Sequence, residues 1–306
     1  MPTRRFIQVD VFTETPFCGN PLAVILDGHG LTGDQMQAIA REMNLSETTF
    51  ILPPTDASAH VKVRIFTPQI ELPFAGHPVV GTGYVLATEG LLPRPAESFA
   101  IHRELGVGVL PVDIACADGA VAQVMMTQRA PQFLAELPLD DVGRLARGLG
   151  IEAQDLLSAG LPTQLVSTGL PQLVVPLRSL AAMRAITLEL GVLHTICERY
   201  GTHSIYAFTC ETVTPSAQVH SRLFAPLAGV LEDPATGSAS GALGAYLVHH
   251  RVFGGEAEVI RLENEQGYEM GRPSRILIEV SRNGGTITRV RVGGQVVKVM
   301  DGTIYV

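Results

Sequence analysis

Hydrophobic and polar positions alternate in short segments along the whole chain, and this pattern predicts β-strands. Segments with period two or with many β-branched residues lie at residues 6–12, 61–66, 120–126, 164–167, 218–224, 275–280 and 286–292. Because they are spread over the full length, we expect strands throughout the chain rather than in one part of it.

Helical patterns lie between some of these strands. Thr32 and Gln35 form a capping-box signature ahead of apolar residues 36, 39, 40 and 43, which share one helical face. Further helices are expected after residues 140–141 and after Ser179. Strands and helices mixed in this way predict an α+β fold.

The chain contains an internal echo. Residues 64–68, Arg-Ile-Phe-Thr-Pro, recur 158 positions later as residues 222–226, Arg-Leu-Phe-Ala-Pro. Gly76 and Gly83 then match Gly237 and Gly244 at a shift of 161, so the second copy is three residues longer. Each copy reads as a strand, a turn and a helix that begins with glycine. We therefore predict two similar domains joined near residues 129–132, the alternative being chance similarity between two strand-turn-helix units.

Composition narrows the function classes. The 306 residues are 46% hydrophobic and carry a formal charge of −8, which disfavours binding to nucleic acid. The sequence shows no long apolar run and no secretory signal pattern, so we expect a cytoplasmic protein that does not contact membranes. Its four cysteines lie far apart without metal-ligand spacing, which favours reduced, mostly buried thiols over disulfides or zinc.

Both predicted helices of the echo, residues 76–83 and 237–244, begin with glycine and consist largely of small residues. Small residues allow a helix to lie deep inside a sheet, and the free N–H groups of its first turn favour an anion such as a carboxylate. We call the first turns, residues 75–78 and 236–238, the helix mouths. Neither stretch is a complete nucleotide-binding glycine motif. Tight packing without a ligand is the alternative, and it is favoured for the glycines beyond the first turn.

Six segments together carry a resemblance to a known family: residues 12–24, 44–48, 74–78, 166–171, 232–238 and 266–274. In this order they resemble the PhzF-like family of phenazine-biosynthesis isomerases. The resemblance implies a diaminopimelate-epimerase-like fold, in which two domains each wrap a β-barrel-like sheet around a central helix and the active site lies in the cleft between them. It also implies a cofactor-independent homodimer. The corresponding domains are residues 1–128 plus 299–306, and residues 129–298.

Site residues follow from the same resemblance. Glu47 matches the family's acid/base glutamate, although alone it reads as an exposed residue at the start of a strand. A carboxylate can move protons near neutral pH when its site removes it partly from water. His77 and Asp233 match residues that contact substrate, whereas on their own they read as a structural histidine and a turn residue. The expected substrate-binding set is Ser46, Gly76, His77, Asp233, Thr236, Gly237 and Ser238.

These residues predict an isomerase that uses Glu47 as base and then as acid to move a proton between carbons of a small carboxylate-bearing, compact or cyclic metabolite. The resemblance supplies one example of a substrate, a dihydro-hydroxyanthranilate. A related branch of the fold racemises amino acids with a cysteine at each mouth, but here Ala75-Gly76 and Thr236-Gly237 occupy those places. The alternatives are a racemase or epimerase that pairs Glu47 with another residue, and a non-catalytic carboxylate-binding protein. No metal or cofactor is expected.

Overall fold

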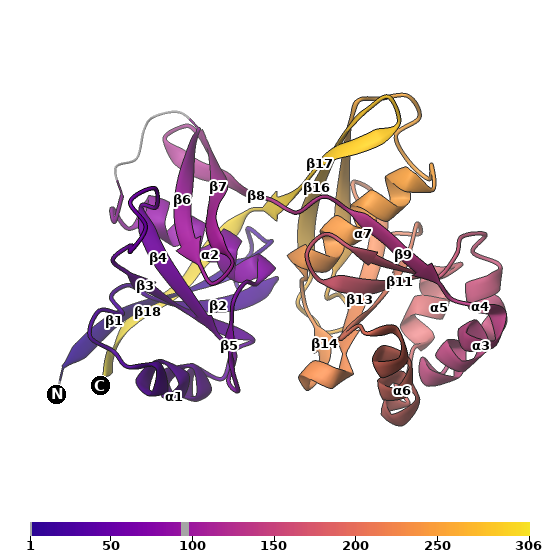
Figure 1. Cartoon of the computed structure of the whole chain (residues 1–306), viewed down its shortest axis with the longest axis horizontal. Helices are drawn as coiled ribbons and strands as arrows, with labels where there is room; N and C mark the ends of the chain where they lie inside the picture. The colour runs from indigo at the N-terminus through magenta and orange to yellow at the C-terminus, as the bar shows by residue number, and fades with distance from the viewer. Residues whose placement is uncertain (1, 93–97) are drawn as a thin grey trace. The chain divides into compact units, whose positions relative to one another are not determined.

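The chain forms two compact units in a computed structural model that describes residues 2–92 and 98–306. The first unit comprises residues 1–127 and 293–306, and the second comprises residues 128–292. In Figure 1 the first unit runs from indigo to magenta and includes the yellow C-terminal strand β18 (Val296–Tyr305), while the second unit runs from magenta through orange to the yellow strand β17 (Thr286–Gly294).

The first unit is built from nine strands and two helices in the described part of the chain. The strands are β1 (Thr3–Val11), β2 (Asn20–Ile25), β3 (Glu47–Leu52), β4 (Val61–Phe66), β5 (Glu71–Leu72), β6 (Phe99–Leu105), β7 (Gly108–Ala117), β8 (Ala120–Thr127) and β18 (Val296–Tyr305). The helices are α1 (Gly33–Met43) and α2 (Gly76–Thr88).

The second unit holds the remaining elements. Its strands are β9 (Gln132–Glu136), β10 (Gln164–Ser167), β11 (Pro171–Pro176), β12 (Ile205–Thr209), β13 (Val219–Ala225), β14 (Val230–Asp233), β15 (Val259–Gln266), β16 (Ser274–Asn283) and β17 (Thr286–Gly294), the last of which runs into the first unit. Its helices are α3 (Leu139–Gly148), α4 (Ala153–Leu157), α5 (Leu180–Ala185), α6 (Leu190–Tyr200), the 3-10 turn η1 (Pro226–Ala228) and α7 (Gly237–His249).

Strand pairing repeats between the units. Along β1, β2, β3, β4, β6 and β7 the successive pairings are antiparallel, parallel, antiparallel, parallel and antiparallel. The strands β10, β11, β12, β13, β15 and β16 follow the same succession. The outer strands β18 and β9 pair antiparallel with the equivalent strands β1 and β10. The echo in the sequence therefore reflects a repeated architecture, and the predicted α+β class is confirmed.

Each unit encloses one helix. Helix α2 contacts β1, β2, β3, β7 and β8, and helix α7 contacts β10, β11, β15 and β16. Nearly all of their residues are buried. Gly81 shows why residues of α2 must be small. A Cβ atom at this position would lie 2.6 Å from Leu22 Cδ2 and 2.8 Å from Val11 Cγ2. Any larger residue would push the helix away from β1 and β2.

Other helices cover the outside of the sheets. The apolar face of α1 packs through Met36 and Ala40 against Ile25, Phe50 and Phe66 of β2, β3 and β4. In the second unit α3, α4, α5 and α6 contribute to a larger apolar cluster over β10 to β13. Among the helices of the described residues, none combines the length and apolar character needed to cross a membrane.

The helix starts predicted at Thr32 and Ser179 and most predicted strands are confirmed, but the helix expected after residues 140–141 begins earlier, at Leu139, so Asp140 and Asp141 lie in its first turn. The reciprocal capping box of Thr32 and Gln35 is present, and Ser179 caps α5. The first strand differs from the predicted residues 6–12, because it begins at Thr3 and ends at Val11. Phe12 has φ = 65°, a left-handed conformation that cannot continue a strand.

Candidate active site

The mouth of α2 lies in the first unit and carries His77 in its first turn. The N-cap residue Ala75 has extended backbone and no side chain that could cap the helix, so side chains leave the first N–H groups uncapped. His77 is only 6% exposed and its ring hydrogen-bonds to the backbone carbonyl of Pro21. Burial lowers the pKa of His77 to about 3. The imidazole is therefore neutral at physiological pH.

Glu47 faces this imidazole. It is the first residue of β3, and its Oε2 lies 3.3 Å from His77 Nε2, with side-chain exposures of 15% and 7%. Parallel pairing of β2 with β3 places Leu22 opposite Glu47, so Pro21 and Glu47 reach the same imidazole from neighbouring strands. Ser46, which directly precedes the strand, is half-buried.

The contact between Glu47 and His77 is not a conventional ion pair, although the distance alone would permit one. A neutral imidazole that donates one N–H to the Pro21 carbonyl has an unprotonated second nitrogen, and Nε2 is then a hydrogen-bond acceptor. The imidazole is neutral because the ring is almost completely buried, which disfavours the charged form. His77 Nε2 can therefore accept a hydrogen bond from Glu47 when Oε2 carries a proton, or from a donor group on a bound molecule.

The mouth of α7 lies in the second unit and carries the other predicted residues. Thr236 is the N-cap, and Gly237 and Ser238 form the start of the first turn. The Thr236 side chain does not cap the helix, because its Oγ1 donates a hydrogen bond to Oδ2 of Asp233 at the end of β14. Ser238 and Asp233 are half-buried. Thus the predicted residues form two groups, one at each mouth.

Two further residues of the α7 mouth were not predicted from the sequence. Gln128 donates from Nε2 to the Gly237 carbonyl at 2.9 Å and accepts from Thr168 Oγ1 at 2.5 Å. Gln266 binds both Asp233 and Thr236 through its side-chain amide. Gln266 lies in a segment that carries the family resemblance, which is the signal that could have identified it, whereas Gln128 lies outside these segments.

The described residues form no metal-binding cluster, and neither helix mouth contains a cysteine. Within residues 2–92 and 98–306 no group of three His, Cys, Asp or Glu side chains is arranged to bind a metal ion. The four cysteines are free, but the prediction that they are mostly buried is wrong. Only Cys197 is buried, Cys18 and Cys116 are half-buried and Cys210 is exposed. The N-cap positions Ala75 and Thr236 carry no thiol.

The sequence of this chain matches a known protein family. Residues 9–302 match the PhzC-PhzF family, described as phenazine biosynthesis-like protein. An uncharacterised isomerase of Mesorhizobium japonicum is 38% identical, with all of both chains covered. Trans-2,3-dihydro-3-hydroxyanthranilate isomerase of Pseudomonas aeruginosa is 34% identical over 98% of this chain and 99% of the relative.

Solved structures agree with the sequence relatives. A PhzF-family phenazine biosynthesis protein of Bacillus anthracis superposes with a TM-score of 0.88 at 31% identity, with all of both chains covered. A hydroxyproline epimerase of Agrobacterium vitis shares the fold alone, with a TM-score of 0.65 and 13% identity over 99% of this chain and 92% of that one. The chain therefore belongs to the phenazine biosynthesis-like family and is an isomerase of the PhzF type.

Proposed function

We propose that this isomerase moves a proton between two carbons of a small, ring-shaped carboxylate, with Glu47 as the only proton carrier. The observation that carries the proposal is the 3.3 Å contact between Glu47 Oε2 and the neutral, buried His77. A carboxylate in a mostly buried site is a suitable base for a weakly acidic C–H group. The neutral imidazole beside it does not neutralise the carboxylate charge, and its Nε2 can accept a hydrogen bond from Glu47 once Glu47 is protonated.

The proposed reaction has two steps. The Glu47 carboxylate removes a proton from one carbon, and the electron pair left behind shifts the adjacent double bond. Glu47, now a carboxylic acid, returns the proton to a second carbon of the same molecule. Substrate and product are isomers, so no oxidant, reductant or second substrate is required. His77 Nε2 orients the protonated Glu47 by accepting its hydrogen bond between the two steps.

Substrate binding is assigned to the helix mouths. At the α2 mouth, N–H groups that no side chain caps suit a carboxylate, because the positive end of the helix dipole points toward them. We assign Asp233, Thr236, Gly237 and Ser238 to polar groups of the substrate as well. The relative from Pseudomonas aeruginosa suggests the substrate class, since its name specifies a dihydro-hydroxyanthranilate.

The test uses trans-2,3-dihydro-3-hydroxyanthranilate in deuterated water, with proton NMR to follow isomerisation and the site of deuterium uptake. We expect Glu47→Gln to lower the rate by about 10² to 10⁴ because the titratable proton is lost. The matched control is Glu42→Gln, since Glu42 is exposed on α1. Binding of anthranilate, a stable ring carboxylate, should survive in Glu47→Gln.

Three results would change the proposal. Unchanged turnover by Glu47→Gln would assign the base to another residue. No turnover by the parent chain would reject this substrate class. Inversion at a stereocentre without migration of the double bond would identify a racemase or epimerase instead.

A further inference from the structure

Gln266 ends strand β15 with its side chain directed at the α7 mouth. Side chains alternate along a strand, so Asn264 and Gln266 share one face while Glu265 lies on the other. Asn264 donates to Tyr206 Oη at 2.7 Å and to Ser240 Oγ of α7 at 3.2 Å. The face of β15 that carries Asn264 and Gln266 therefore lies against the start of α7.

The amide of Gln266 is completely buried, and both of its ends are fully used. Nε2 donates to the Asp233 carbonyl at 2.7 Å and to Thr236 Oγ1 at 3.1 Å. Oε1 accepts from the Thr236 backbone N–H at 3.1 Å and from the Tyr206 hydroxyl at 2.9 Å. A backbone N–H can only donate, which fixes the orientation of the amide.

The hydrogen bonds of Gln266 determine which group accepts the hydrogen bond that the Thr236 hydroxyl donates. Thr236 Oγ1 accepts from Gln266 Nε2 and donates to Asp233 Oδ2. A hydroxyl has only one proton to donate, so a hydroxyl that accepts on the Gln266 side is free to donate toward the carboxylate. Gln266 thus acts on the Asp233 side chain through Thr236, while it also binds the main chain of Asp233.

Tyr206 supports Gln266 from the core of the second unit. Burial raises the pKa of the Tyr206 phenol to about 12, so the hydroxyl remains a donor at any physiological pH. Its oxygen also accepts from Ser221 Oγ at 2.9 Å. This network of hydrogen bonds is buried, and each bond is strong because no water competes for it.

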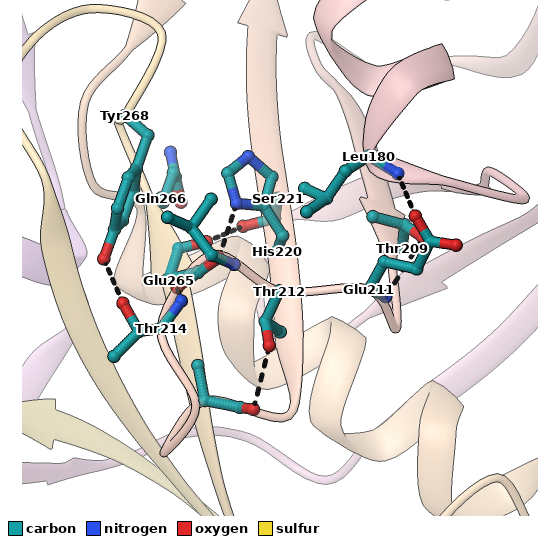
Figure 2. Close-up of polar contacts among 12 residues, drawn as sticks. Leu180, Thr209, Glu211, Thr212, Thr214, His220, Ser221, Glu265, Gln266 and Tyr268 are labelled. Atoms are coloured by element: carbon teal, nitrogen blue, oxygen red, sulfur yellow. Dashed lines mark hydrogen bonds and ion pairs between the residues drawn. The ribbon is translucent and has the colours of Figure 1, made fainter.

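The chain on either side of Gln266 is fixed as well (Figure 2). Glu265 accepts from His220 Nδ1 at 2.8 Å. His220 Nε2 lies 3.1 Å from Glu269 beyond the turn. Gly267 has φ = 81° and a Cβ there would lie 2.5 Å from the Pro234 carbonyl oxygen, so the turn packs directly against the segment that follows Asp233. Gln266 has little freedom to move away from the mouth.

We propose that Gln266 is a positioning residue that sets the orientation of Asp233 for substrate binding. The inference rests on the proposed function, in which Asp233 contacts the substrate. It adds a buried amide, held by Tyr206, to the groups on which turnover depends. Misplacement of a binding group by about 1 Å is enough to cost on the order of 10²-fold in rate.

The test substitutes Gln266→Glu, which keeps the shape and the acceptor for Thr236 N–H but replaces the donor facing Asp233 with a second oxygen. We expect kcat/KM for trans-2,3-dihydro-3-hydroxyanthranilate to fall by about 10- to 100-fold, with much of the loss in KM. Tyr206→Phe, which leaves the Gln266 amide in place but removes the donor to Oε1 together with the acceptor for Asn264 and Ser221, should give a smaller loss of the same kind. The matched control is Gln172→Glu, since Gln172 is also a buried amide of the second unit and binds Ser204.

A double-variant experiment separates positioning from a general loss of structure. If Gln266 acts through Asp233, then Gln266→Glu should cost less than about threefold when Asp233→Asn is already present. The same fall in both backgrounds, or no fall in either, would overturn the proposal. So would an equal fall in the Gln172→Glu control.

The role of Gln266 can also be tested without a substrate, in case the proposed function is wrong. Should the parent chain not turn over this compound, hydrogen exchange at the Thr236 amide still decides whether Gln266 holds the mouth. We expect exchange at least 10-fold faster in Gln266→Leu, which lacks the acceptor, than in the parent chain. Unchanged exchange would reject the role of Gln266 whatever the substrate is.

Discussion

Arg64 and Arg222 make two equivalent contacts in the two units. Each guanidinium lies over the ring of the phenylalanine two positions further on, at 5.0 and 5.1 Å, and each forms a bidentate ion pair with a glutamate. The glutamates are Glu71 and Glu232, and each stands five positions before the first residue of α2 or α7. The repeated pairs therefore brace the hairpins that lead into the two mouths.

The two braces should differ in strength. Side-chain exposures are 10% and 16% for Arg222 and Glu232, against 27% and 43% for Arg64 and Glu71. We expect Arg222→Gln to lower the free energy of unfolding by about 3 kcal/mol, because it leaves the largely buried Glu232 carboxylate without its partner. Arg64→Gln should cost about 1 kcal/mol or less. Urea unfolding of both variants measures this, and equal losses would contradict it.

His77 should make the protein less stable in acid. Its pKa is about 3 in the folded state and near 6.5 when unfolded, so below pH 6.5 the unfolded chain binds a proton that the folded chain does not. The contribution is present above pH 6.5 and is lost as the pH falls toward 3, by about 1.4 kcal/mol per pH unit. Urea unfolding from pH 7 to 4 should give a shallower acid slope for His77→Gln than for the parent chain. Parallel slopes would mean that His77 is charged in the fold.

His220 should act in the opposite direction. Burial lowers its pKa, but hydrogen bonds and ionic attraction from Glu265 and Glu269 outweigh burial and leave the pKa raised. Its contribution to stability is therefore present below pH 6.5 and is lost as the pH rises through the folded-state pKa. The difference in unfolding free energy between the parent and His220→Gln should shrink between pH 6 and pH 9. A difference that grows over this range would show that the imidazole is neutral.

A buried hydroxyl pair joins α2 to β3. Thr49 Oγ1 and Thr82 Oγ1 are 2.9 Å apart, and both residues are inaccessible to solvent. Thr82→Val should cost about 1–3 kcal/mol of unfolding free energy because it leaves the Thr49 hydroxyl unpaired. The double variant Thr49→Val with Thr82→Val should recover much of this loss. Losses that simply add in the double-mutant cycle would exclude a direct interaction.

The sequence predicted elements best where local chemistry decides them. The capping box at Thr32 depends on residues three positions apart, and it was found as predicted. The echo also indicated the duplicated architecture. The three added residues of the second copy fall between Arg222 and Glu232, where the 3-10 turn η1 lies, whereas the shorter loop between Arg64 and Glu71 has none.

Contacts between distant segments could not be predicted in the same way. The approach of Glu47 to His77 depends on the packing of α2 against β3, which no local pattern encodes. Gln266 is a single amide at the end of a strand, and its importance appears only when β14 and α7 are brought beside it. Family resemblance identified Glu47 as a candidate, but the neutral state of its neighbour follows from burial in the folded chain.

The pairing of β18 with β1 has a consequence for the order of folding. Thr3 pairs with Tyr305, and the backbone N–H of Val306 donates to the Pro2 carbonyl, so the two ends of the chain meet in the first unit (Figure 1). The second unit is continuous from residue 128 to residue 292 and can form as soon as those residues are synthesised. Until β18 follows, β1 presents an unpaired edge, which invites non-native strand pairing. The half of the protein that is synthesised first is thus the last to complete its sheet.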